Sequence, residues 1–434
     1  MRRLTDNQSR QVCRWAFLML CALPTLVVIV LASRVWKTED WELLIAAELN
    51  LDVQIERVEN PFPGRTVLHA VRVRRGAEEI GTVEQVECNW FGDWRLNLGA
   101  TKLEARGLER LRLSLREMTD RQGAGGTRRA WHLRCPELTL KRPLNPAGAT
   151  SIDEPAEELK LCNLELLSSP AAEETRQLLR LQLPSAAKGG DYPIEMRILQ
   201  GMTSAERQVW LNVSSPTPVW LLAGLGGFPE GWDEELLFCG SLDYRQLGRG
   251  PTSGRLEAAV LSNIELGWLR DVWGVNLSGR AEIQIPALTW REGRVHQAEF
   301  QVQAADGNFS PRWLEALGRV PGVRTFELPE GLATADVIPF RLFAARFLLQ
   351  FGRCRVAPIN QSTAALCWDA DDQPLLAIEQ PGYVQTDLEL LARLSLEPEN
   401  PELLADDQLV ELLRHFHLPP DSRSARQPTP LELR

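Results

Sequence analysis

Two histidines near the C-terminus form the most ligand-like pair in the sequence. His415 and His417 follow Asp406, Asp407 and Glu411, and all five are residue types that bind divalent metals. On a helix, however, positions i and i+2 point in different directions, so the two imidazole rings do not converge on one ion. The spacing therefore favours an ordinary solvated helix end, where histidine also complements the helix dipole.

A second group of candidate ligands lies in the aspartate-rich turn that follows Trp368. Asp369, Asp371 and Asp372 carry carboxylates of the kind that hold calcium. The run lacks the glycine and the distal glutamate of an EF-hand loop, so a solvated hairpin tip is the favoured interpretation. We predict neither a metal site nor a cofactor.

The sequence contains none of the motifs that mark the common enzyme classes. It has no nucleophile elbow, no glycine-rich phosphate loop, no HExxH motif and no paired-cysteine metal motif. The remaining histidines, His69, His132 and His296, are dispersed and have no acid or nucleophile partner evident in the sequence. We therefore predict that the protein is not an enzyme.

Alternating apolar and polar residues predict the strands that would position any site. Apolar or small residues occupy the odd positions from Leu277 to Ile285, and residues 298–304 repeat the pattern after a turn. Residues 254–260 give a third example. In each strand one side is apolar and the other is polar. The apolar residues that we take as candidate binding residues are Ile283, Ile285, Phe300, Val302, Leu256 and Val260.

Short strands separated by turn signals recur through most of the chain, and only a few helices interrupt them. Ser310 and Pro311 begin one helix, Thr38 caps a short helix, and residues 401–417 carry the apolar spacing of an amphipathic helix. We predict a mainly β fold. The expected form is an extended, twisted antiparallel sheet folded into a groove or a sandwich, with an N-terminal transmembrane helix and a few short helices.

The overall charge argues against nucleic acid as a partner. The chain carries a formal net charge of -10, whereas a nucleic-acid interface is basic. The first fourteen residues are the exception, because four arginines outnumber a single aspartate there. A basic tip before an apolar stretch is typical of the cytoplasmic side of a membrane anchor.

The apolar stretch from Trp15 to Ser33 predicts that anchor. It contains nineteen residues without a charge, which at the helical rise corresponds to roughly 28 Å, close to the thickness of the bilayer core. The positive-inside rule then places the N-terminus in the cytoplasm and the bulk of the chain outside. A cleaved signal peptide is the alternative, with Val30-Leu31-Ala32 as its cleavage site.

The cysteines do not show the spacing of a zinc site. Six of the eight lie outside the apolar N-terminal region, and no two of them form a CxxC motif. Several of them occupy the apolar sides of expected strands, which favours buried free thiols. A disulfide between Cys354 and Cys367 across a hairpin is the alternative.

The order of elements resembles that of the AsmA-like envelope proteins, which include TamB-type and related bridge-like lipid-transfer proteins. The shared order is one anchor, a short helix, a strand at residues 51–58 and many further strands. The resemblance is closest at Leu277-Ser-Gly-Arg-Ala-Glu-Ile-Gln-Ile, at Gly293-Arg-Val, at Ala305-Asp-Gly-Asn-Phe-Ser-Pro-Arg-Trp-Leu, and at residues 340–356, which end in Gly352-Arg-Cys-Arg-Val. This chain is much shorter than the bridging members, and irregular segments around Asp120 and Asn145 interrupt its strand pattern.

The resemblance implies an architecture and a location. Residues 1–36 would form the cytoplasmic tip and anchor, 37–215 an N-terminal AsmA-like β region, 216–400 a C-terminal AsmA-like β region, and 401–434 an amphipathic helix with a disordered tail. The protein would be anchored in the bacterial inner membrane, with its bulk in the periplasm. Its expected partners are the membrane, phospholipid and other envelope proteins.

Two functions remain open from the sequence. In the first, the apolar sides of the strands line a groove that binds or conducts lipid acyl chains for envelope maintenance. In the second, the same residues form a closed β core in an anchored structural or partner-binding protein without lipid cargo. Alternation alone does not separate the two, because both need one apolar side on each strand.

Overall fold

A computed structural model gives the fold of the chain, and most of the residues that it describes lie in strands. This confirms the prediction of a mainly β protein. The described residues are 6–26, 38–49, 52–62, 64–75, 78–89, 93–104, 107, 130–141, 158–170, 174–183, 193–201, 206–224, 235–248, 250, 252–267, 277–328, 336–360, 363–380 and 382–387. The helix expected at residues 401–417 lies outside them.

The chain divides into two compact units. The first comprises Met1–Pro170 with Leu181–Gly189, and the second comprises Ala171–Arg180 with Gly190–Arg434. The boundary that we predicted between two AsmA-like regions, after residue 215, stays a prediction.

Helical structure at the N-terminus covers residues 6–26. It consists of α1 (Asp6–Phe17), the π-helical segment η1 (Leu18–Ala22) and one further turn at residues 23–26. Trp15, Phe17 and Leu20 are well exposed, at 63%, 65% and 75%. Within the described residues, no helix combines the length and the apolar character needed to cross a membrane. Residues 27–33 of the expected anchor lie outside the described part.

The first unit contains a mixed sheet, which corrects the prediction of antiparallel pairing throughout. Its strands are β1 (Asp52–Gln54), β2 (Arg57–Phe62), β3 (Arg65–Arg75), β4 (Glu78–Asn89), β5 (Trp94–Leu98), β6 (Thr101–Glu104), β7 (Trp131–Lys141) and β8 (Glu158–Pro170). Strands β5 and β6 pair with β7 in parallel, while the other described strand pairs of this unit are antiparallel. Parallel pairing requires a long connection, and residues 105–130 provide one between β6 and β7.

The helix α3 (Thr38–Leu49) covers part of the apolar core of the first unit. Its Trp41 is 9% exposed and packs into a cluster with Leu68, Val71 and Val86. The Glu42 carboxylate accepts a hydrogen bond of 2.7 Å from the backbone N–H of Ile55, which ties the helix to the chain between β1 and β2. A helix therefore closes this end of the unit.

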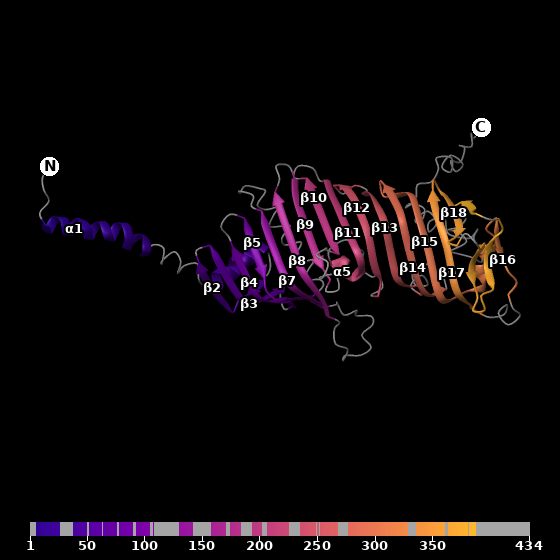
Figure 1. The fold of residues 1–434 in the computed structure, drawn as a ribbon, viewed down its shortest axis with the longest axis horizontal. Helices are drawn as coiled ribbons and strands as arrows, with labels where there is room; N and C mark the ends of the chain where they lie inside the picture. The colour runs from indigo at the N-terminus through magenta and orange to yellow at the C-terminus, as the bar shows by residue number, and fades with distance from the viewer. Residues whose placement is uncertain are drawn as a thin grey trace, which may run out of the picture. The chain divides into compact units, whose positions relative to one another are not determined.

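The second unit is built from long antiparallel strands that pair mostly in chain order (Figure 1). Pairing runs from β10 through β15, and then continues to β17, β18 and β21. The strands are β9 (Glu174–Gln182), β10 (Ile194–Gly201), β11 (Glu206–Pro218), β12 (Leu237–Leu247), β13 (Thr252–Glu265), β14 (Leu277–Arg291), β15 (Arg294–Phe309), β16 (Val323–Thr325), β17 (Ile338–Gln350), β18 (Arg353–Pro358), β19 (Ala365–Trp368), β20 (Pro374–Ile378) and β21 (Val384–Asp387).

The pairing register defines an apolar face and a polar face on these strands. Residues paired across antiparallel strands share one face. One such row is apolar along its length and joins Met196, Leu211, Leu242, Leu256, Leu288, Ala298, Leu349 and Cys354. We call the side that carries this row the apolar face. The opposite side, which carries the row Gln284, Gln301 and Arg346, is the polar face.

Helices and short strands close the apolar face towards both ends of the second unit. Helix α5 (Val219–Gly224) contacts β11, and its Leu221 and Leu222 are 1% exposed. At the other end, α7 (Pro311–Gly318) packs into the core that also contains residues of β19 and β20. Ser310 accepts a hydrogen bond of 3.4 Å from the backbone N–H of Trp313, which confirms the expected N-cap.

Candidate functional site

The apolar face contains five of the six candidate residues. Ile283 pairs directly with Val302, and Phe300 lies two positions along β15 on the same side. Ile285 follows Ile283 on β14 and pairs with Ala259. Leu256 pairs with Leu288 in the apolar row that crosses the unit. These side chains come from three neighbouring strands and form one continuous surface.

The structure separates Val260 from the other five candidates. Val260 pairs with Gln284, which places it on the polar face. Regular alternation would keep Leu256 and Val260 on one side, but Ala258 adopts φ 48° and the register with β12 shifts at this point. A β-bulge of this kind adds a residue to one strand and reverses its alternation. Gly240 on β12 accommodates the bulge, because a Cβ there would lie 2.6 Å from the Cα of Ala259.

Most of the larger side chains in the middle of the apolar face are only half-buried, while the alanines paired with them, Ala259, Ala298 and Ala345, are buried. The half-buried residues are Leu242, Leu256, Leu261, Ile283, Ile285, Leu288, Phe300, Val302 and Phe347, and we call them the half-buried strip. On β10 and β11 the same face is closed, since Ile194 is 0%, Leu211 3% and Val213 1% exposed. Between β11 and β15 the large side chains of the apolar face therefore change from buried to half-buried.

Several residues of the half-buried strip were not among the candidates predicted from the sequence. Leu242, Leu261, Leu288 and Phe347 lie beside the predicted candidates and share their face. The ring of Phe347 stacks on Phe300 with centroids 4.9 Å apart. The strand pattern at residues 340–351 could have indicated Phe347, but its pairing with β15 skips over α7 and β16 and is not evident from sequence order.

The polar face of the same strands carries charged and amide side chains. Arg346 pairs with the carboxylate of Glu299 across β15 and β17, and Gln284 donates a hydrogen bond of 2.8 Å to Glu282. The half-buried strip, by contrast, contains only hydrocarbon side chains. Such a surface offers contact to apolar groups and no directional recognition of polar ones.

The aspartate-rich turn proves to be a hydrogen-bonded hairpin tip. One carboxylate oxygen of Asp369 accepts hydrogen bonds from the backbone N–H groups of Asp371, at 2.9 Å, and Gln373, at 2.7 Å. Asp372 pairs instead with Arg341. Among the described residues no group of three or more histidine, cysteine or acidic side chains is arranged to hold a metal. His415 and His417 lie outside that part of the chain.

One histidine does find a partner that the sequence did not indicate. His132 Nε2 lies 2.9 Å from Glu165 on the neighbouring strand β8, and Arg134 donates to the same carboxylate oxygen at 3.1 Å. Burial opposes ionisation of Glu165, but the hydrogen bonds from Arg134 and His132 outweigh it and lower the pKa of the carboxyl. The cluster stabilises the pairing of β7 with β8.

All the cysteines are free thiols, so Cys354 and Cys367 do not form the disulfide considered above. Both are buried, at 0% and 2% exposed, in the core of the second unit. Burial raises the pKa of Cys88, Cys354 and Cys367 to about 12. These side chains act as small apolar core residues.

No protein-family model matches the chain, and a search of curated proteins finds no match. The resemblance to AsmA-like proteins therefore stays a hypothesis based on the residues quoted for it.

Proposed function

We propose that this protein binds lipid acyl chains along the half-buried strip of its second unit. The observation that carries the proposal is the change in burial along one apolar face, where Leu211 is buried and Ile283, Phe300 and Val302 are half-buried. A continuous strip of large apolar side chains that the domain leaves only partly covered is consistent with a binding surface.

The dimensions of the strip suit one acyl chain. It crosses five strands, β12 to β15 and β17, which at the usual strand spacing corresponds to about 19 Å. The hydrocarbon chains of one bilayer leaflet extend about 15 Å, half the thickness of the bilayer core. An acyl chain would therefore fit across these strands in an extended conformation.

The energetics favour weak and exchangeable binding. Covering about ten methylene groups on one side would contribute about 4 kcal/mol, half the value for complete burial, which corresponds to a Kd of about 1 mM. A lipid held in this way would exchange readily, which suits transfer between membranes better than storage. Because the strip has no polar side chain, the cargo would be selected by its hydrocarbon part.

The proposal includes a membrane anchor at residues 15–33, with the N-terminus in the cytoplasm and the bulk of the chain in the periplasm. The apolar side chains of Trp15, Phe17, Leu20 and Leu26 are exposed, as they would be in contact with lipid. With the strand-rich body, this arrangement is the one expected of a short AsmA-like protein of the bacterial inner membrane that contributes to envelope maintenance.

A structural or partner-binding role with a closed core is the second candidate. The sealed face of β10 and β11 and the closed core around Leu314 and Ile338 favour it in their own regions. This role predicts that the half-buried strip is covered by protein in the cell. The two candidates therefore differ in what contacts Phe300 and Ile283.

Photo-crosslinking of the full-length protein in its membrane tests the proposal. Benzoylphenylalanine introduced at Ile283 or Phe300 should form crosslinks to phospholipid, detected by mass spectrometry. The matched controls are Gln284 and Gln301, the next residues along the same strands, which lie on the polar face. Lipid crosslinks should be at least about tenfold less abundant at the controls.

Two outcomes would contradict the lipid proposal. In one, the strip positions crosslink only to protein, which supports the closed structural role. In the other, strip and control positions crosslink to lipid equally, which indicates contact with the membrane surface without a site. The variant Ile283→Asp adds a stability measurement, since a closed core would unfold on burying the charge, whereas an accessible strip would lose lipid and remain folded.

A further inference from the structure

Three hairpin turns follow one another along one edge of the second unit. They join β12 to β13, β14 to β15 and β17 to β18, and these hairpins are neighbours because β13 pairs with β14 and β15 with β17. The backbone N–H of Gly293 donates to the carbonyl of Thr252 at 2.7 Å, which connects the first two turns. At the usual strand spacing the outer turns are about 19 Å apart. We call residues 245–248, 291–294 and 350–353 the turn edge.

Both outer turns of the turn edge expose a large apolar side chain. Leu247 is 70% exposed and Phe351 is 59% exposed. Phe351 also adopts φ 49°, in the left-handed region, where a two-residue hairpin turn usually has asparagine, aspartate or glycine. The turn at Glu292 has nearly the same φ, 53°, without an aromatic residue, so the turn itself does not require Phe351. A bulky apolar residue kept at an exposed and strained position points to a function.

The turn edge also carries an excess of positive charge. Its four arginines share the polar face, according to the pairing register, and they are Arg245, Arg291, Arg294 and Arg353. None of the four forms an ion pair within the described part of the chain. The turn edge contains one carboxylate, Glu292, while Glu206 and Asp387 border it on the outer strands β11 and β21. This basic edge contrasts with the formal net charge of -10 of the whole chain.

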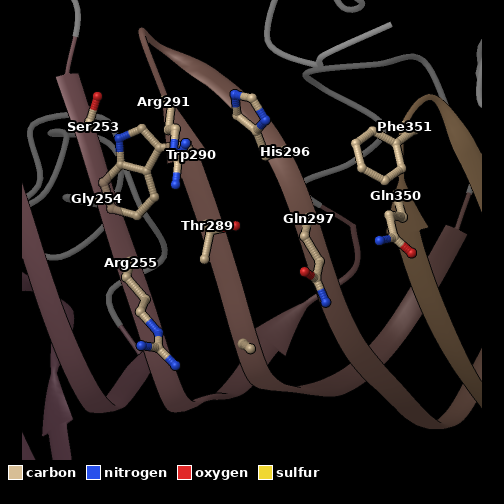
Figure 2. Close-up of a pocket in the computed structure, with 11 residues that line it drawn as sticks. Ser253, Gly254, Arg255, Thr289, Trp290, Arg291, His296, Gln297, Gln350 and Phe351 are labelled. Carbon is tan, nitrogen blue, oxygen red and sulfur yellow. The ribbon is translucent and has the colours of Figure 1, made fainter. Parts of the chain in front are cut away.

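A hollow of about 650 Å³ lies beside the turn edge (Figure 2). Its lining includes Arg255, Arg291, Gln297 and Phe351, and no carboxylate is among the described residues that line it. Arg255 pairs with Glu257, so Arg291 is the arginine in this lining that remains available to an anion. Guanidinium and amide N–H groups are the donors that phosphate oxygens accept. The hollow therefore suits a phosphate group that approaches the turn edge.

We propose that the turn edge docks on the surface of an anionic phospholipid membrane. Leu247 and Phe351 would enter the headgroup layer, and the four arginines would pair with lipid phosphates. A folded protein partner would need a rigid surface matched to three separate turns, whereas a fluid headgroup layer adapts to them.

This docking goes beyond the proposed lipid site and does not depend on it. The arginines lie on the polar face, whereas the half-buried strip lies on the apolar face of the same strands. Docking would bring one end of the strands that carry the strip against a membrane. It would do so whether or not the strip holds an acyl chain.

Vesicle capture by the full-length protein in phosphatidylcholine nanodiscs tests this docking. The protein is immobilised and offered fluorescent vesicles of phosphatidylcholine alone or of phosphatidylcholine with phosphatidylglycerol, and empty nanodiscs give the background. Vesicles with phosphatidylglycerol should be captured at least about tenfold more strongly than neutral ones. High salt should weaken their capture, because it screens the charges.

Two variants of the turn edge separate its charge from its apolar contact. The double variant Arg291→Gln with Arg294→Gln should weaken the capture of anionic vesicles about 30-fold. Phe351→Asn should weaken it about tenfold without lowering the melting temperature, since asparagine suits the left-handed turn.

The matched control is Arg319→Gln with Arg324→Gln, which removes the same charge after α7 and on β16, outside the turn edge, and should capture vesicles like the wild type. The proposal is overturned if neutral and anionic vesicles are captured equally, or if neither exceeds the background. It is also overturned if either variant of the turn edge behaves like the wild type, or if the control loses as much. Benzoylphenylalanine at Phe351 that crosslinks only to protein in the native membrane would instead assign the turn edge to a protein partner and overturn the proposal.

Discussion

The rings of Phe300 and Phe347 stack across β15 and β17, with centroids 4.9 Å apart and planes inclined by 15°. Stacking of this kind contributes about 0.5–1.5 kcal/mol beyond the burial of the two side chains. Both residues are nevertheless only half-buried, whereas Phe340, at the other end of β17, is 3% exposed. One strand thus carries a buried phenylalanine and a half-buried one.

This contrast within β17 predicts different costs for the same substitution. Phe340→Ala should lower the free energy of unfolding by about 3–5 kcal/mol, because it leaves a cavity in a closed core. Phe347→Ala should cost about 2 kcal/mol, since part of its ring is already accessible to solvent. Urea denaturation of both variants measures the difference. Equal losses would mean that the half-buried strip is part of a closed core.

The bulge at Ala258 predicts opposite environments for Leu256 and Val260. Benzoylphenylalanine at Leu256 should crosslink to lipid like the other strip positions, while at Val260 it should not, although only four residues separate the two. The structural reason is that Leu256 pairs with Leu288 and Val260 with Gln284. Lipid crosslinks of similar abundance at both positions would rule out the observed register or the lipid site.

The lowered pKa of Glu165 predicts a pH-dependent contribution to stability. A carboxyl whose folded pKa lies below its unfolded value of about 4.3 stabilises the protein above that pH, and the contribution is lost as the pH falls through the folded pKa. Glu165→Gln should therefore destabilise the protein at pH 7 and have little effect near pH 3. Urea titrations at the two pH values test this, and a constant difference between them would contradict it.

The raised pKa values of Cys88, Cys354 and Cys367 predict inert thiols. With a pKa of about 12 and little exposure, each carries almost no thiolate near neutral pH. Iodoacetamide should leave all three unmodified in the folded protein, while the exposed Cys13 reacts. Alkylation after unfolding without a reductant should then modify all eight cysteines, and a protein with only six reactive thiols would contain a disulfide.

The periodicity of the sequence determined the strands and the apolar character of one side of each. Alternation from Leu277 to Ile285 and from residue 298 to 304 appears unchanged in β14 and β15, because side chains of an extended chain must point to alternate sides. The N-cap at Ser310 was likewise a local property, since its hydrogen bond spans three residues. Such features depend only on neighbouring residues in the chain, so they can be predicted without knowing the tertiary structure.

Only the tertiary structure decided which residues share a face and which of them stay accessible. The bulge at Ala258 depends on its fit against Gly240 on the neighbouring strand, and it moved Val260 to the polar face. The core at α7 likewise joins segments distant in sequence, because Leu314 packs in one cluster with Leu366 and Leu376. The pairing of β15 with β17 skips over α7 and β16, and it leaves no local trace in the sequence.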